Sequence, residues 1–220
     1  MSGKKKILIG VGIVVVLGGV AFANVKFKRN TGIEVTTHMR WVVLVEGPSD
    51  KGAVEALARK LGRDLAGEGV EVVSIGGAHA IGRVVAELTD DIRPAGLCDI
   101  GEIIPFGRAL ERAGVGPAGT REELEALGFY VCEPDLEGEL IRALGAEGVE
   151  GVLEKSGKLS SFRTFQKQPQ WRGRPVDAQL RRFFGSSAGK ARHAPLMVDS
   201  LPLDRIPRPL EALLAHIGSG

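Results

Sequence analysis

The stretch that most constrains the fold of this 220-residue chain is Val-Val-Leu-Val-Glu-Gly-Pro-Ser-Asp, at residues 42–50. Its four leading apolar residues, three of them β-branched, predict a short buried strand. The Gly-Pro pair ends this strand, and Ser49 or Asp50 can cap a following helix, whose apolar residues recur at helical spacing over residues 54–61. Glu46 therefore sits at the carboxyl end of a strand, where open α/β sheets bind ligands. It is either placed for metal or phosphate chemistry, or it is an acid that satisfies turn amides.

Three further strands are predicted along the chain, each with helical periodicity nearby; they lie at residues 70–75, 94–99 and 129–132. This alternation predicts an α/β fold with a mainly parallel four-stranded sheet flanked by helices. Acids end three of the strands, namely Glu46, Asp99, and either Glu133 or Asp135. Parallel strands share one carboxyl edge, so we expect these carboxylates to converge, as a Mg²⁺ or Mn²⁺ site requires. Any one of them could instead cap the helix that follows it.

The small net charge of +2 hides a strong asymmetry along the chain. Residues 39–154 carry 11 Lys/Arg against 22 Asp/Glu, whereas residues 155–193 carry 10 Lys/Arg against one acid. We therefore divide the chain into a catalytic domain at 39–148 and a basic helical extension at 149–217.

The basic stretch also holds five of the eleven aromatic residues. These residues could stack on bases, or they could form the core of a helical subdomain whose cations face nucleic acid or the acidic front of the chain. The candidate nucleic-acid contacts are Lys167, Arg172, Arg174, Arg181, Arg182 and Arg192.

The N-terminal segment raises a separate question. Residues 7–23 are 17 consecutive uncharged residues after three lysines, near the lower limit for a membrane span, and both a signal anchor and a cleaved signal stay open. Up to about residue 38 the segment resembles the membrane leader of bacterial efflux adaptor proteins. We interpret residues 1–38 as an appended segment, which would anchor the chain to a membrane only if it is native. The two cysteines, Cys98 and Cys132, lie in apolar runs without a C-x-x-C motif, which favours a reducing, cytoplasmic compartment.

Two glycine-rich motifs carry no function in this reading. Residues 114–119 fit G-x-G-x-x-G but lie between predicted helices, so we expect a plain loop. Residues 185–190 approach a Walker A loop, yet they are one residue short and are followed by Ala191. We therefore expect no ATPase in this chain.

Three ordered motifs resemble the Toprim domain, the metal-dependent fold of topoisomerases, primases and OLD-family nucleases. They are Leu-Val-Glu-Gly-Pro-Ser-Asp at 44–50, Ile-Gly-Gly at 75–77 and Leu-Cys-Asp at 97–99. The resemblance covers about residues 39–145. The E-G-x-S-D form and the short helical tail are most similar to small OLD-like Toprim proteins that occur without their ATPase partner domain.

The resemblance implies roles for several residues. Glu46 would be the general acid/base. Asp99 would be the principal ligand of a Mg²⁺ or Mn²⁺ ion, assisted by Asp50 and Glu137. A lysine in the tail of the OLD-like group completes the site, and Lys190 is the candidate for stabilising transition-state charge.

One departure from the family pattern bears on function. The third motif is D-x-D in the family, but here Gly101 stands at the second Asp, and Glu102, one place later, is the candidate substitute. We expect a divalent-metal-dependent nuclease acting on DNA or RNA, with DNA favoured. The alternative is a catalytically weak module that binds nucleic acid or a separate P-loop ATPase. A homo-oligomer is a further expected partner state.

Overall fold

The computed structural model describes the backbone of residues 27–28, 34–35, 40–186 and 190–218, and side chains within residues 40–185 and 193–218. The apolar segment at 7–23 and the side chains of Lys190 and Arg192 therefore lie outside the described residues. Within the described ranges, no helix is both long and apolar enough to cross a membrane.

Four parallel strands form the central sheet, which confirms the predicted fold class. They are β3 (Trp41–Val45), β4 (Val70–Ser74), β5 (Arg93–Asp99) and β6 (Phe129–Cys132), in the order β4-β3-β5-β6. Asp99 lies opposite Cys132 and Val45 lies opposite Ser74, so the strands end close to one edge of the sheet. Two two-residue strands, β1 (Phe27–Lys28) and β2 (Glu34–Val35), pair separately.

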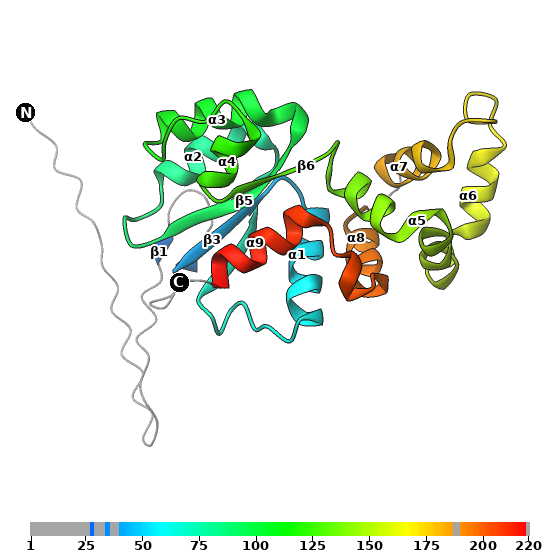
Figure 1. Cartoon of the computed structure of the whole chain (residues 1–220), viewed down its shortest axis with the longest axis horizontal. Coiled ribbons are helices and arrows are strands. Elements are labelled where there is room, and N and C mark those ends of the chain that lie inside the picture. Colours follow the sequence, from blue (N-terminus) through cyan, green and yellow to red (C-terminus); the bar gives the residue numbers. More distant parts are fainter. Residues whose placement is uncertain (1–26, 29–33, 36–39, 187–189, 219–220) are drawn as a thin grey trace, which may run out of the picture.

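Helices cover both faces of the sheet (Figure 1). Helices α1 (Pro48–Lys60) and α9 (Arg208–Gly218) pack on one face, and α2 (Ile81–Ala86), α3 (Ile103–Arg112) and α4 (Arg121–Ala126) on the other. Along β3, Val43 and Val45 join the first core, whereas Val42 and Leu44 join the second. A strand buried on both faces reads as an uninterrupted apolar run, which is what residues 42–45 show. Short 3₁₀ turns η1 (Ala78–Ala80), η2 (Ile100–Glu102) and η3 (Leu203–Arg205) link these elements.

A helical extension projects from the sheet (Figure 1). It consists of α5 (Leu136–Lys155), α6 (Leu159–Gln166), α7 (Val176–Ser186) and α8 (Lys190–Ser200), and α8 packs back against α1. Helix α5 is interrupted at Gly145, whose positive φ of 71° breaks the helical path. The division expected at residues 148/149 falls inside α5.

The aromatic residues of the extension gather into its core. Phe162, Phe183 and Phe184 are buried, while Phe165 and Trp171 are half-buried and stack on each other at 5.2 Å. The two uses foreseen for these rings therefore resolve in favour of packing, because rings held against one another have little face left for a base.

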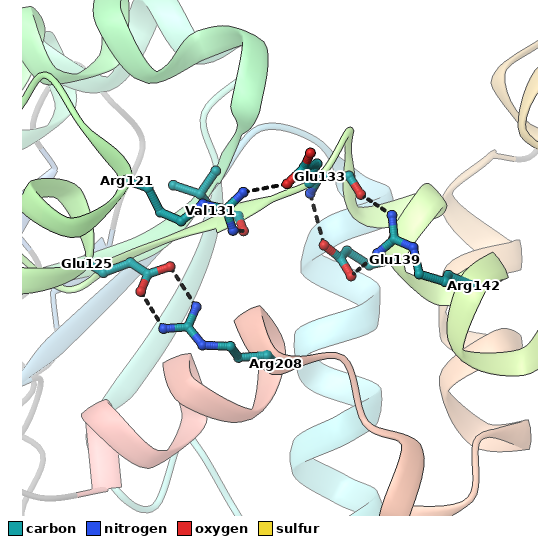
Figure 2. Close-up of polar contacts among 7 residues, drawn as sticks. All are labelled: Arg121, Glu125, Val131, Glu133, Glu139, Arg142 and Arg208. Carbon is teal, nitrogen blue, oxygen red and sulfur yellow. Dashed lines mark hydrogen bonds and ion pairs between the residues drawn. The ribbon is translucent and has the colours of Figure 1, made fainter.

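Helix α9 returns the chain to the sheet. His216 packs edge-on against Trp41, at the start of β3, with 5.1 Å between ring centroids. Arg208 forms a two-pronged ion pair with Glu125 of α4, at 2.7 and 2.5 Å (Figure 2). The end of α9 therefore lies beside the beginning of the first central strand.

Candidate active site

Glu46 stands exposed at the carboxyl end of β3. Its backbone carbonyl accepts hydrogen bonds from the amides of Gly76 and Gly77, at 3.0 and 3.2 Å. Both glycines have positive φ, 75° and 120°, a conformation that other residues rarely adopt. The Ile-Gly-Gly motif after β4 therefore fixes the turn that carries Glu46.

The N-terminus of α1 is capped differently from the sequence expectation. The N-cap is Gly47, and Asp50 caps from inside the first turn, where its Oδ2 accepts a hydrogen bond from the Gly47 amide at 2.9 Å. Ser49 is buried, and its hydroxyl donates to Glu137 Oε1 at 3.0 Å. This bond ties the first turn of α1 to the first turn of α5, so Asp50 and Glu137 are held on neighbouring helix ends.

The turn after β6 decides between Glu133 and Asp135. Figure 2 shows Glu133 held by Arg121 of α4 at 2.7 Å, while Glu139 accepts from the Glu133 amide at 2.9 Å and from Arg142 at 2.8 Å. The Glu133 carboxylate is thus committed to Arg121. Asp135 instead caps α5 and faces the other strand ends.

Asp135 carries a cation from the extension. Its Oδ1 accepts from the Gly138 amide at 2.8 Å, and its Oδ2 accepts from Nε and Nη2 of Arg181 at 2.9 and 2.6 Å. The sequence analysis grouped Arg181 with the nucleic-acid contacts. In the structure it is the guanidinium nearest the acidic edge for which a partner is seen.

Asp99 is the most strongly perturbed carboxyl of this edge. Glu46, Asp50 and Asp99 line one small pocket together with apolar side chains and the two cysteines. Burial raises the pKa of Asp99 to about 7, and the charges of Asp50, Glu46, Asp135 and Glu137 raise it further. Five carboxyl groups therefore repel one another around a single point of the sheet edge.

The donor set fits a divalent cation in chemistry and charge. Carboxylate oxygens are the ligands that Mg²⁺ and Mn²⁺ prefer, and excess negative charge is what a dication would offset. The side chains are not gathered into a ready cage, because Asp50, Asp135 and Glu137 each accept hydrogen bonds from protein donors. Among the residues that the structure describes, no three His, Cys, Asp or Glu side chains are grouped closely enough to hold a metal. These carboxylates would have to turn toward Asp99 to bind an ion.

The two cysteines of this pocket are free and buried. Burial, with the nearby Asp99 charge, raises the thiol pKa of both Cys98 and Cys132 well above the ordinary value. Both thiols therefore stay protonated, and they act as apolar packing beneath the carboxylates.

The third motif places its remaining residues on the rim. Glu102 is the N-cap of α3 and lies close enough to Cys98 to raise the thiol pKa, but it is not among the carboxylates that raise the pKa of Asp99. Gly101 is exposed, and a Cβ placed there would meet no atom within 4 Å. A side chain is therefore sterically free to occupy the position of the second Asp.

The other candidate cations are spread over the extension. Lys167, Arg172 and Arg174 are exposed around the loop between α6 and α7, at the end of the extension away from the sheet (Figure 1). Arg182 is exposed on α7. Lys190 begins α8, and its side chain and that of Arg192 lie outside the described residues.

Sequence reasoning missed two contacts of this site. Neither the Ser49–Glu137 bond nor the Asp135–Arg181 pair was foreseen. The second had a signal, since one basic segment opposite one acidic segment suggests pairing between them, but charge counts name no partners.

Comparisons with known proteins agree with this geometry. Residues 39–98 match the family model described as "Overcoming lysogenization defect protein-like, TOPRIM domain". The structure resembles the C-terminal region of the OLD protein of Xanthomonas campestris pv. campestris, with 26% identity and a TM-score of 0.62 over 81% of this chain and 92% of that one. It also shares the fold of the C-terminal region of the Burkholderia pseudomallei OLD protein, at 18% identity and a TM-score of 0.59 over 81% and 97%. No curated protein matched.

Proposed function

We propose that this chain, which contains a Toprim domain of the OLD-like type, is a divalent-metal-dependent nuclease that hydrolyses phosphodiester bonds, in DNA rather than RNA. The observation that carries the proposal is Asp99, whose pKa is raised to about 7 because it is half-buried among four other carboxyl groups. Perturbed carboxyls crowded at the carboxyl edge of a parallel sheet are costly to the fold and are typical of catalytic sites.

The residues divide the work according to their positions. Asp99, with Asp50 and Glu137, would hold Mg²⁺ or Mn²⁺, which when bound neutralises charge developing on the phosphodiester. Glu46 is exposed beside them on a turn fixed by two backbone hydrogen bonds, so it can exchange a proton with the attacking water or the leaving oxygen. Lys190, at the start of α8, is proposed to stabilise the transition-state charge.

Exposed cations on the extension support a polymeric substrate. Lys167, Arg172 and Arg174 stand at its far end, and Arg182 lies between them and the sheet along α7. We propose that these residues, with Arg181 and Arg192, neutralise backbone phosphates along the path toward the carboxylates. Such contacts confer affinity without reading sequence, and they should weaken as the salt concentration rises.

The test is ion-dependent cleavage by the wild-type chain and its Glu46→Gln variant. Both are incubated with plasmid DNA, single-stranded DNA and RNA, with Mn²⁺, Mg²⁺ or EDTA. We expect cleavage of DNA by the wild type that EDTA abolishes, and a loss of at least about 100-fold in rate for the variant. Equal cleavage by the two proteins would remove Glu46 from the mechanism. Absence of both cleavage and Mn²⁺ binding would refute the nuclease proposal.

A second function is favoured by Gly101. The family motif has a carboxylate there, and this chain has none, so one ligand of the metal site is absent and Glu102 lies on the rim. The chain would then act as a catalytically weak module that binds nucleic acid or a separate P-loop ATPase, in the cytoplasm. Binding of DNA without cleavage, together with copurification of a P-loop protein, would favour this function.

A further inference from the structure

A second pocket adjoins the carboxylate edge, in the angle between α5 and α7. It has a volume of about 340 Å³ and is lined by residues from the start of α5, from the Gly145 break and from α7. Ligand sites of small molecules begin at roughly 300 Å³, so the pocket has room for one nucleotide unit.

The pocket shares a wall with the candidate active site. Arg181 lines the pocket and also binds Asp135, and the charges of Asp99 and Glu137 reach it strongly enough to contribute to its raised pKa. Pro134 and Gly138, which also line it, flank Asp135 and Glu137 in sequence. A ligand in this pocket would lie directly beside the carboxylates.

Two guanidinium groups equip the pocket for a phosphate. Arg181 uses Nε and Nη2 for Asp135, and among the described residues its Nη1 makes no hydrogen bond. Arg142 is held in place from behind, since its Nη1 donates to Glu139 and its Nη2 donates to the Glu133 carbonyl (Figure 2). Fixed guanidinium groups bind phosphate with little loss of side-chain freedom.

The remaining walls are suited to the uncharged part of a nucleotide. Pro134 and Ile141 offer apolar surface, and Ala146 and Ala178 are small and exposed. Asp177, also on the wall, is the one acid of residues 155–193. A carboxylate there repels phosphate and accepts hydrogen bonds from amino or hydroxyl groups, so the phosphate is directed to the arginines and the nucleoside to the far wall.

We propose that the pocket between α5 and α7 binds the nucleotide next to the scissile bond, with its phosphate on Arg181 and Arg142 and its nucleoside against Ile141 and Ala178. This subsite rests on the proposed nuclease function for the identity of its ligand. It gives Arg181 a role in seating the substrate, in addition to its pairing with Asp135.

The test fills the pocket and measures binding without catalysis. The full chain and its Ala178→Phe and Ala146→Phe variants are titrated by calorimetry with thymidine 5′-monophosphate, thymidine and inorganic phosphate. Both alanines are exposed, so the larger side chains need not disturb the core. The matched control is Ala126→Phe, at an exposed alanine of α4 outside the pocket, and circular dichroism checks the fold of each variant.

We expect the wild type and the control to bind the nucleotide at least about tenfold more tightly than phosphate, and both pocket variants to lose that preference. Unchanged nucleotide binding in the two pocket variants would overturn the subsite, as would wild-type affinity no greater for the nucleotide than for phosphate. Cleavage and Mn²⁺ binding separate the two proposals. Cleavage with an unaltered KM in both pocket variants would refute the subsite and leave the nuclease, whereas nucleotide binding without Mn²⁺ binding or cleavage would do the reverse.

Discussion

Replacing Asp99 with Asn should make the metal-free protein more stable while removing its metal response. The native carboxyl is half-buried among four others, which raises its pKa from 3.8 to about 7. The folded state therefore holds a proton between about pH 4 and 7 that the unfolded chain releases. Stability must fall as the pH rises through that window, and the full cost is present above about pH 8. An asparagine of the same shape carries no charge and avoids this cost.

The size of the effect follows from the pKa shift. At full strength the shift corresponds to roughly 4 kcal/mol, at 1.36 kcal/mol for each pH unit. Asp99 is only partly buried, so solvent screening lowers our expectation to about 2 kcal/mol at pH 8. For a chain of this length that gain would raise the melting temperature by roughly 4–8 °C.

The assay is thermal and urea unfolding of wild type and Asp99→Asn at pH 5 and pH 8, with and without Mn²⁺. We expect the variant to exceed the wild type at pH 8 by more than at pH 5, and Mn²⁺ to stabilise the wild type alone. Asp204→Asn, at an exposed aspartate of η3, controls for loss of any one acid. The reasoning would be refuted by an Asp99→Asn variant that is no more stable at pH 8, or by a control that behaves in the same way.

Three further predictions concern the same structure. Gly101→Asp adds a carboxylate where a Cβ meets no atom within 4 Å, so Mn²⁺ affinity should rise at least about tenfold by calorimetry; an unchanged affinity would place this rim too far from the ion. Wild-type Mn²⁺ affinity should fall by roughly tenfold for each pH unit below about 7, since the ion must displace the Asp99 proton, and a flat profile from pH 5 to 7 would contradict this. Arg208→Ala should lower the free energy of unfolding by only ~1 kcal/mol in urea titrations, because its pair with Glu125 is largely exposed, whereas a loss above ~2 kcal/mol would show that this pair is the main anchor of α9.

The sheet was predictable because its information is local. Residues 42–45 and 129–132 are short apolar runs bounded by turn residues, and both form strands that are mostly buried on two faces. Strand order needs no side-chain detail once parallel strands alternate with helices. The gathering of acids at one edge follows from that topology alone, which is why the sequence pattern was enough to place Glu46 and Asp99 together.

What the sequence left open depended on competition among distant donors. Glu133 and Asp135 are two residues apart and equally acidic, and the choice between them is made by Arg121 on α4 and Arg181 on α7. Arg181 lies 46 residues from Asp135, a separation over which neither periodicity nor capping rules carry information. The cap of α1 was misassigned for a local reason, since Asp50 can serve the helix from its first turn as well as from the residue before it.

The ring contact between Trp41 and His216 has a consequence for protein engineering. The first central strand and the last helix meet at one corner, so a few flexible residues could connect them, and new ends could be opened in a surface loop elsewhere. The loop at 167–175 is a suitable opening, since most of its residues are exposed. A circular permutant cut there would keep the sheet and its carboxylate edge covalently continuous. For the same reason the whole unit could be inserted into a surface loop of a host protein without spreading the host's chain apart.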